Sequence, residues 1–254
     1  MLARMRGTRR SEQRENNERM QPGELGHRWE FRLGVMLAEL LRTDGVEEVC
    51  ELRSRIGLMA FHGGSLEVVT DVVATEAAER AGASIYAIRQ PWGFRWHIPS
   101  NAMDPADSAT LQAFIEHVDC AIAVHGWGTD GWTQDARPSF AFEPNAFRFG
   151  SDGKDRPLLV GGLNRDLAGR VAACIRAALP HYEVVDDLDR IPPNVRGLDP
   201  RNLVNRVRDG GVQLELTPRV RGLPPFWDKE QRGRACPDTQ ALIDALASAV
   251  AAAG

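Results

Sequence analysis

Several features that would place this 254-residue chain in a special class of protein are absent. It contains no run of about 18 apolar residues, so neither a transmembrane helix nor a membrane partner is expected. Basic residues do not outnumber acidic ones, and a net charge of −4 does not favour a nucleic-acid partner. The four cysteines include no CxxC pair, and Cys120 and Cys174 are predicted to be reduced core residues rather than disulfide partners or zinc ligands.

The first 26 residues also lack the apolar segment of a secretory signal. They are rich in Arg, Glu, Gln and Asn, a composition that predicts a disordered extension over residues 1–26. The absence of a signal favours a cytoplasmic location. Residues 27–254 suffice for one large catalytic domain, and a hydrophobic content of 43% is ordinary for globular proteins.

Strand-like and helix-like patterns alternate along most of the chain. Short apolar runs predict buried strands, and longer segments with apolar residues at helical spacing predict helices. The expected strands are 56–61, 84–88, 96–98, 120–124, 157–160, 182–185 and 211–216, and the expected helices are 29–41, 67–81, 107–117, 166–179 and 239–253. This order predicts a single three-layer α/β domain, with a mixed, mostly parallel sheet and helices on both faces. Residues 129–155 break the rhythm and predict an insertion loop.

Two of the expected strands end in His-Gly. Residues 61–67 (FHGGSLE) place His62 at the end of one strand and Glu67 five residues later, and His125 ends another. Because the carboxyl ends of parallel strands share one edge of a sheet, these side chains are expected to converge. Two histidines and a glutamate are the ligand types of a catalytic zinc with one open position. A tight turn before a helix, with Glu67 in its first turn and a structural His125, explains the same residues without a metal.

Two further residues are candidates for chemistry. His97, between Trp96 and Ile98, is compatible with a metal ligand, a hydrogen-bond donor to such a ligand, a substrate contact or a structural histidine. In residues 211–216 (GVQLEL), alternation places Gln213 and Glu215 on one face. A carboxylate on an interior strand needs a partner, a metal or a catalytic role, whereas on an edge strand it is simply solvated.

Polar residues flank that last strand. Asn202, Asn205 and Arg206 precede it and Arg221 follows it. An arginine can bind a substrate carboxylate through two hydrogen bonds, although a helix cap and a surface charge account for these residues equally. Residues 161–164 (GGLN) allow an alternative interpretation as a phosphate-binding loop, although they do not form a complete nucleotide-binding motif.

Taken in order, these motifs resemble the poly-γ-glutamate hydrolase family, zinc amidohydrolases similar in fold to the zinc carboxypeptidases. The matching segments are 61–67, 96–100, 124–126, 160–164, 202–206 and 211–216, followed by Arg221. The resemblance implies a zinc-carboxypeptidase-like fold. It also implies a Zn²⁺ cofactor held by His62, Glu67 and His125.

The resemblance further implies hydrolysis of amide bonds, such as γ-glutamyl linkages, with Glu215 as general base and Arg206 orienting the anionic substrate. Asn205, His97 and Arg221 are the implied substrate-binding residues. The expected partner is a small molecule or peptide with free carboxylates. Two alternatives stay open: a non-catalytic binding protein that kept the fold, and a hydrolase of other peptides or N-acyl amino acid amides.

Overall fold

The computed structural model describes residues 36–127, 157–223 and 236–253. They belong to one compact unit within residues 34–254. The predicted disordered extension over residues 1–26 and the predicted insertion over residues 129–155 lie outside the described residues. The same holds for the first seven residues of the helix predicted over residues 29–41.

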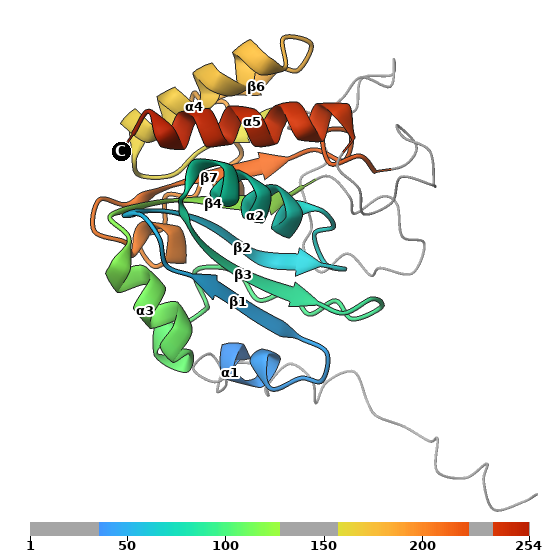
Figure 1. Ribbon diagram of the computed structural model, residues 1–254, viewed down its shortest axis with the longest axis vertical. Helices are drawn as coiled ribbons and strands as arrows, with labels where there is room; N and C mark the ends of the chain where they lie inside the picture. Colours follow the sequence, from blue (N-terminus) through green and yellow to red (C-terminus); the bar gives the residue numbers. More distant parts are fainter. Residues whose placement is uncertain (1–35, 128–156, 224–235, 254) are drawn as a thin grey trace, which may run out of the picture. The chain divides into compact units, whose positions relative to one another are not determined.

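A seven-stranded sheet with the order β1-β3-β2-β4-β7-β5-β6 forms the centre of the unit (Figure 1). Strands β3, β2, β4 and β7 are parallel, β1 is antiparallel to β3, and β5 is antiparallel to β7 and parallel to β6. The strands are β1 Glu47–Glu51, β2 Ile56–Gly64, β3 Ser84–Gln90, β4 Cys120–Gly126, β5 Leu158–Val160, β6 Val184–Val185 and β7 Gly211–Leu216. The carboxyl ends of β2, β4 and β7 therefore lie along one edge of the sheet.

Helices cover both faces of this sheet (Figure 1). They are α1 Met36–Leu41, α2 Thr70–Ala81, α3 Ala109–His117, α4 Arg165–Ala178 and α5 Pro237–Ala251, with 3₁₀ turns at Pro105–Asp107, Pro193–Val195 and Leu203–Asn205. One core joins α2, α4 and α5 to alternate sheet residues such as Leu58 and Leu214, and the other joins α1 and α3 to Met59 and Ala123. The predicted three-layer α/β domain with a mixed sheet is confirmed.

Two local predictions are wrong, and one strand was not predicted, for identifiable reasons. Residues 96–98 form no strand, because the Gln90 side chain supplies the hydrogen bonds: Nε2 donates to the carbonyl of Trp96 at 2.8 Å, and Oε1 accepts from its N–H at 2.7 Å. The helix expected from Glu67 begins at Thr70, and Glu67 lies in the preceding turn. Strand β1 was not expected, because its sequence EEVCE lacks an apolar run.

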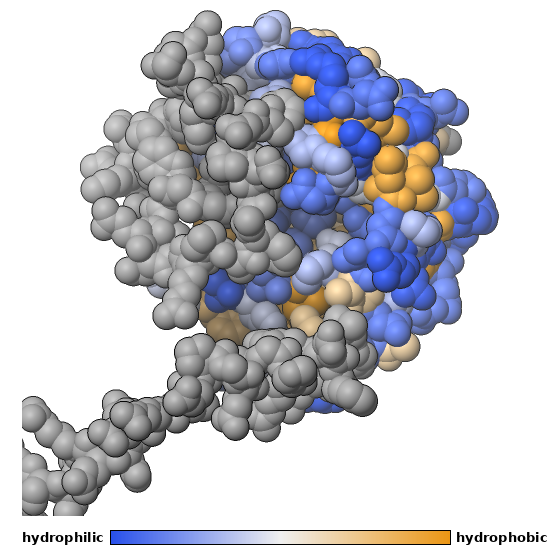
Figure 2. Space-filling view, turned by 180° about the vertical axis from the view of Figure 1, so that it is seen from behind, coloured by the Kyte–Doolittle hydropathy of each residue, from blue (hydrophilic) through white to orange (hydrophobic). Residues whose placement is uncertain are grey.

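The described surface offers no extended apolar area. Its exposed large hydrophobic residues are Leu52, Trp92 and Leu163, which belong to separate segments. On the face drawn in Figure 2, hydrophobic residues lie in small groups among hydrophilic ones. None of the described helices combines the length and apolarity needed to cross a bilayer.

Candidate functional site

His62 faces His125 because strand β2 contains an extra residue near its end. Strand β2 pairs Met59 with Ala123 of β4, so an uninterrupted strand would direct His62 and His125 to opposite faces. Over Ala60–Gly63, however, β2 shifts its register against β3. Such a bulge re-aims the side chains that follow it. The two imidazole rings consequently lie on the same side, with centroids 5.1 Å apart.

Glu67 approaches the two histidines from the turn between β2 and α2. Its backbone N–H donates to the carbonyl of His62 at 2.8 Å, which closes the turn. The glycine at position 64 has φ of 71°, and its N–H donates to Oδ1 of the buried Asp71 at 3.1 Å. The other oxygen of Asp71 accepts from Arg89 Nε at 3.0 Å. The loop that carries Glu67 is thus anchored to both α2 and β3.

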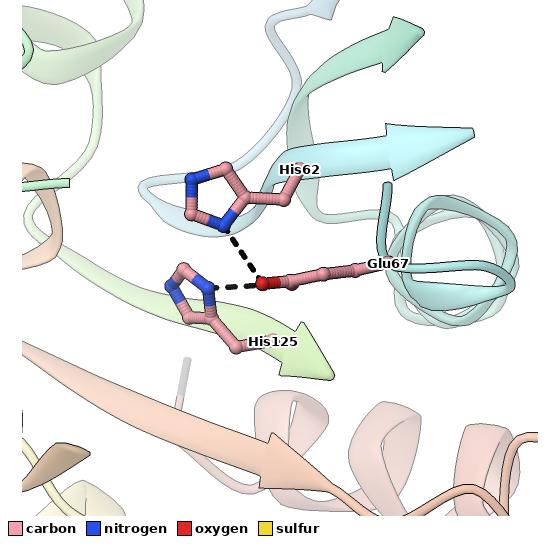
Figure 3. Close-up of side chains that lie close together, drawn as sticks. All are labelled: His62, Glu67 and His125. Atoms are coloured by element: carbon pink, nitrogen blue, oxygen red, sulfur yellow. Dashed lines mark hydrogen bonds and ion pairs between the residues drawn. The ribbon is translucent and has the colours of Figure 1, made fainter. Parts of the chain in front are cut away.

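His62, Glu67 and His125 form a cluster in which one possible ligand atom from each residue lies within 4.8 Å of the others (Figure 3). Glu67 Oε1 lies 2.9 Å from His62 Nδ1, and Glu67 Oε2 lies 3.5 Å from His125 Nδ1. The His62 and His125 side chains are buried. The carboxylate therefore bridges the two imidazoles away from bulk water.

The surroundings of the cluster fit a bound cation. His62 Nε2 lies 2.8 Å from the carbonyl oxygen of Ile98, which can only accept, so Nε2 carries the proton. In a neutral imidazole, the lone pair of Nδ1 then faces the Glu67 carboxylate, and two acceptors at this distance need a proton or a metal ion between them. His125 Nε2 is a buried nitrogen without a hydrogen-bond partner in the described part of the chain. A His₂Glu set whose imidazole donates to an outer carbonyl is a common arrangement in metal centres.

Charge interactions within the cluster are strong. Burial by itself would raise the pKa of Glu67, but the charges and hydrogen bonds of His62 and His125 hold that pKa well below its usual value. Burial would lower the pKa of His125, yet the Glu67 carboxylate and, more weakly, Glu215 raise it. The carboxylate of Glu67 is therefore ionised at neutral pH, as a metal ligand must be.

Glu215 lies beside this cluster. The β4–β7 ladder pairs it directly with His125, so both side chains point to the same face of the sheet, and Glu215 is only 4% exposed. Burial, with a contribution from Glu67, raises the pKa of Glu215 to about 7, although His125 opposes the change. A carboxyl group with such a pKa can accept and return a proton near neutral pH, as a general base and acid must.

Gln213 and Asp71 are contacts of the site that the sequence-based candidate set lacks. Gln213 Nε2 donates to Glu215 Oε1 at 2.7 Å, and Asp71 braces the turn before Glu67. Alternation along residues 211–216 already placed Gln213 on the same face as Glu215, and this pattern could have identified Gln213 as a residue of the site. Nothing in the sequence around Asp71 distinguishes it from an ordinary helix residue.

The other predicted site residues have different surroundings. The His97 ring packs against His62 in a tilted arrangement, with centroids 4.6 Å apart and an interplanar angle of 42°, so it borders the cluster. Arg221 is fully buried, and its Nη1 donates to the carbonyl of Val68 at 3.1 Å. Its guanidinium also lies against Gly126, where an added Cβ would come within 2.4 Å of Nη1. Both residues therefore adjoin the segments that carry the metal-ligand candidates.

Asn205 and Arg206 have described contacts with other loops. Asn205 Nδ2 donates to the carbonyls of Gly197 at 2.6 Å and Asp199 at 2.9 Å, which braces the loop before β7. Arg206 is exposed and forms an ion pair with Asp104 at 3.8 Å. In the described part of the chain, no hydrogen bond or ion pair joins either side chain to the His-Glu-His cluster, and their roles as substrate ligands stay predictions.

The glycine pair at 161–162 is at the opposite end of the sheet from His62 and His125, because β5 runs antiparallel to β7. The backbone N–H groups of residues 161–164 are all used: they donate to Gln213 O, Arg196 O, Asn205 Oδ1 and Gly211 O. No N–H of this loop is left to bind a phosphate. The structure thus argues against the phosphate-loop alternative.

The chain is similar to one family of known proteins and to several solved structures. A family model described as poly-gamma-glutamate hydrolase matches residues 41–134 and 148–244. Two solved structures are similar over most of their length: a bacteriophage poly-gamma-glutamate hydrolase (20% identity, TM-score 0.65, 86% of this chain and 95% of that one) and YNDL in a zinc-free apo form (18% identity, TM-score 0.60, 80% and 88%). A putative carboxypeptidase from Burkholderia mallei is a weaker match (10% identity, TM-score 0.40, 84% and 65%). No curated protein sequence matches the chain.

Proposed function

Because the chain belongs to the poly-gamma-glutamate hydrolase family, we propose that it is a zinc-dependent hydrolase of γ-glutamyl amide bonds. The observation that carries the proposal is the buried cluster of His62, Glu67 and His125 beside the Glu215 carboxyl group. The similar YNDL structure, which is a zinc-free form, supports zinc as the metal. The substrate class follows from the family, as a small molecule or peptide with free carboxylates.

In this proposal His62, Glu67 and His125 hold the ion. When bound, zinc in such a site lowers the pKa of water and polarises a carbonyl group. Glu215 accepts the proton of the attacking water and later delivers it to the leaving amine. Its pKa of about 7 suits both transfers, because the same group must bind the proton and release it within one catalytic cycle.

Substrate binding is proposed for the residues that border the site. His97, whose ring packs against that of His62, is the first to test. Arg221 places a buried positive charge behind Gly126, whose N–H donates to Glu67 at 2.9 Å. Outside the cluster, the exposed Arg206 is the proposed ligand of a substrate carboxylate, because arginine binds carboxylates through paired hydrogen bonds. Asn205, whose amide donates to Gly197 O and Asp199 O, is proposed to hold the loop next to it.

The direct test is cleavage of poly-γ-glutamate by zinc-loaded protein, with α-linked polyglutamate as the linkage control. Chain shortening should need zinc, stop with a chelator and be lost in Glu215→Gln. The matched control is Glu183→Gln, a surface glutamate whose side chain is 57% exposed, and it should keep full activity.

The outcomes separate the alternatives. Cleavage of N-acyl amino acids, with poly-γ-glutamate left intact, would replace the proposed substrate but keep the chemistry. A protein that binds no zinc and cleaves no amide would be a binding protein that kept the fold, and the proposal would be wrong.

A further inference from the structure

A chain of buried amides leads from a backbone turn to the carboxyl group of Glu215. Asn202 Nδ2 donates to Gln213 Oε1 at 2.7 Å, and Gln213 Nε2 donates to Glu215 Oε1 at 2.7 Å. The three side chains are 7%, 6% and 4% exposed, so water does not replace these bonds. Buried networks of this kind hold their members in one geometry when every polar group is satisfied.

Two backbone groups fix the direction of the chain. The N–H of Val204 donates to Asn202 Oδ1 at 3.3 Å, so the amide nitrogen of Asn202 must face Gln213. The carbonyl of Val195 lies 3.4 Å from Gln213 Nε2, and a carbonyl only accepts. Neither amide can therefore rotate by 180° without placing two acceptors or two donors together.

Packing around Gln213 supports the same conclusion. Gly197 has φ of 67°, and an added Cβ there would lie 2.5 Å from the Cβ of Gln213. Asn205 Nδ2 holds the carbonyl of Gly197 at 2.6 Å. The loop over residues 195–205 is thus closed over the Gln213 side chain, which leaves it little room to move.

This arrangement gives the two carboxyl oxygens of Glu215 different surroundings. Oε1 always receives a donor from Gln213, and the described hydrogen bonds of Glu215 reach only this oxygen. The other oxygen is left to exchange a proton. Since the partner of Glu215 across the ladder is His125, the fixed carboxyl group also has a fixed orientation towards the metal-ligand cluster.

We propose that Asn202 and Gln213 are positioning residues that orient Glu215 for proton transfer. This inference rests on the proposed hydrolase function, with Glu215 as its general base. The residues act through Glu215 rather than by touching the substrate. Their loss should therefore lower kcat and leave both KM and zinc content close to the wild-type values.

The first test is Gln213→Met, which keeps the length of the side chain but removes its donor. Loss of a buried hydrogen bond to a charged group should lower kcat on poly-γ-glutamate by about 10- to 100-fold in the zinc-loaded enzyme. The matched control is Ser84→Ala, which removes two partly buried hydrogen bonds of a buried side chain (to Ser54 O and from Arg53 N) at the other end of the sheet and should leave kcat unchanged. A kcat within twofold of wild type in Gln213→Met, or a loss explained by missing zinc, would overturn the proposal.

The second test is Asn202→Asp, which keeps the acceptor for Val204 but takes the donor away from Gln213. The Gln213 amide should then reverse, so that its oxygen faces Glu215, and kcat should fall by a similar factor. Because both changes break one chain, the double variant should lose no more than Gln213→Met alone. If the two decreases in kcat instead multiplied in the double variant, Asn202 and Gln213 would not act through one chain of hydrogen bonds.

A third measurement does not depend on activity. In NMR spectra of the full chain, the Gln213 side-chain amide should show a slowly exchanging proton. In Asn202→Asp this proton should stay protected but change its chemical shift, because the reversed amide then donates to the new carboxylate instead of Glu215. If wild-type protein failed to cleave any amide, the proposed function would be wrong. This measurement would still show whether Gln213 holds Glu215 through a stable hydrogen bond. A rapidly exchanging amide in the wild type would overturn the proposal.

Discussion

Replacing Glu215 by glutamine should stabilise the metal-free protein at alkaline pH while it abolishes hydrolysis. Burial raises the pKa of this carboxyl from its usual 4.5 to about 7. The folded state therefore binds the proton more tightly than the unfolded state. The stability that this group contributes is fully present below pH 4.5, and it is lost as the pH rises through about 7. A change of this size corresponds to about 3 kcal/mol, since one pKa unit is worth about 1.36 kcal/mol.

Glutamine cannot ionise, and its oxygen can still accept from Gln213 Nε2. Urea denaturation with EDTA, followed by tryptophan fluorescence, should give nearly equal free energies of unfolding for wild type and Glu215→Gln at pH 4. At pH 8.5 the variant should be more stable by up to about 3 kcal/mol. Glu183→Gln, changed on the surface, should track the wild type at both pH values. A difference that did not depend on pH, or a variant less stable at pH 8.5, would refute the reasoning.

Three further predictions concern the cluster and its loop. His125→Ala should lower zinc affinity by more than about 100-fold in chelator competition, whereas the exposed His181→Ala should not; equal affinities would remove His125 from the site. Zinc binding should release more protons as the pH falls towards the raised pKa of His125, because the metal displaces the proton from that imidazole. Calorimetry in two buffers of different ionisation enthalpy measures the number of protons released. Binding without proton release would contradict this prediction. Gly64→Ala should lower the free energy of unfolding by roughly 3 kcal/mol or more, because the added Cβ would lie 2.2 Å from the backbone oxygen of Gln90. The control Gly82→Ala has a similar φ but open space around the added Cβ, and it should lose only about 1–2 kcal/mol. Equal losses in the two variants would exclude the clash as the cause.

Much of the architecture could be predicted because it follows from local patterns. Apolar runs marked the buried strands, and their alternation with helices implied a sheet covered on both faces. The end of a strand is also a local feature, so His62 and His125 could be placed at one edge of the sheet from the sequence alone. The family could be named because short motifs occurred in the right order, and the family model confirms that identification.

What could not be predicted depends on contacts between distant segments. The direction of β5 is set by its pairing with β7, which no pattern within residues 158–160 reveals. The bulge in β2 places His62 on the side of His125, although strict alternation predicts the opposite face. The side chain of Gln90 bonds the backbone of Trp96 in place of a neighbouring strand. A contact between a side chain and a distant backbone segment produces no periodic pattern in the sequence.

The central claim is that His62, Glu67 and His125 together hold one zinc ion beside Glu215. Anomalous diffraction from crystals of the zinc-loaded protein, recorded on both sides of the zinc absorption edge, tests it most directly. One strong peak within about 2.0–2.2 Å of a nitrogen from each histidine and an oxygen of Glu67 is the predicted result. A zinc-loaded crystal with no peak at this cluster, or with its peak bound by other side chains, would contradict the account.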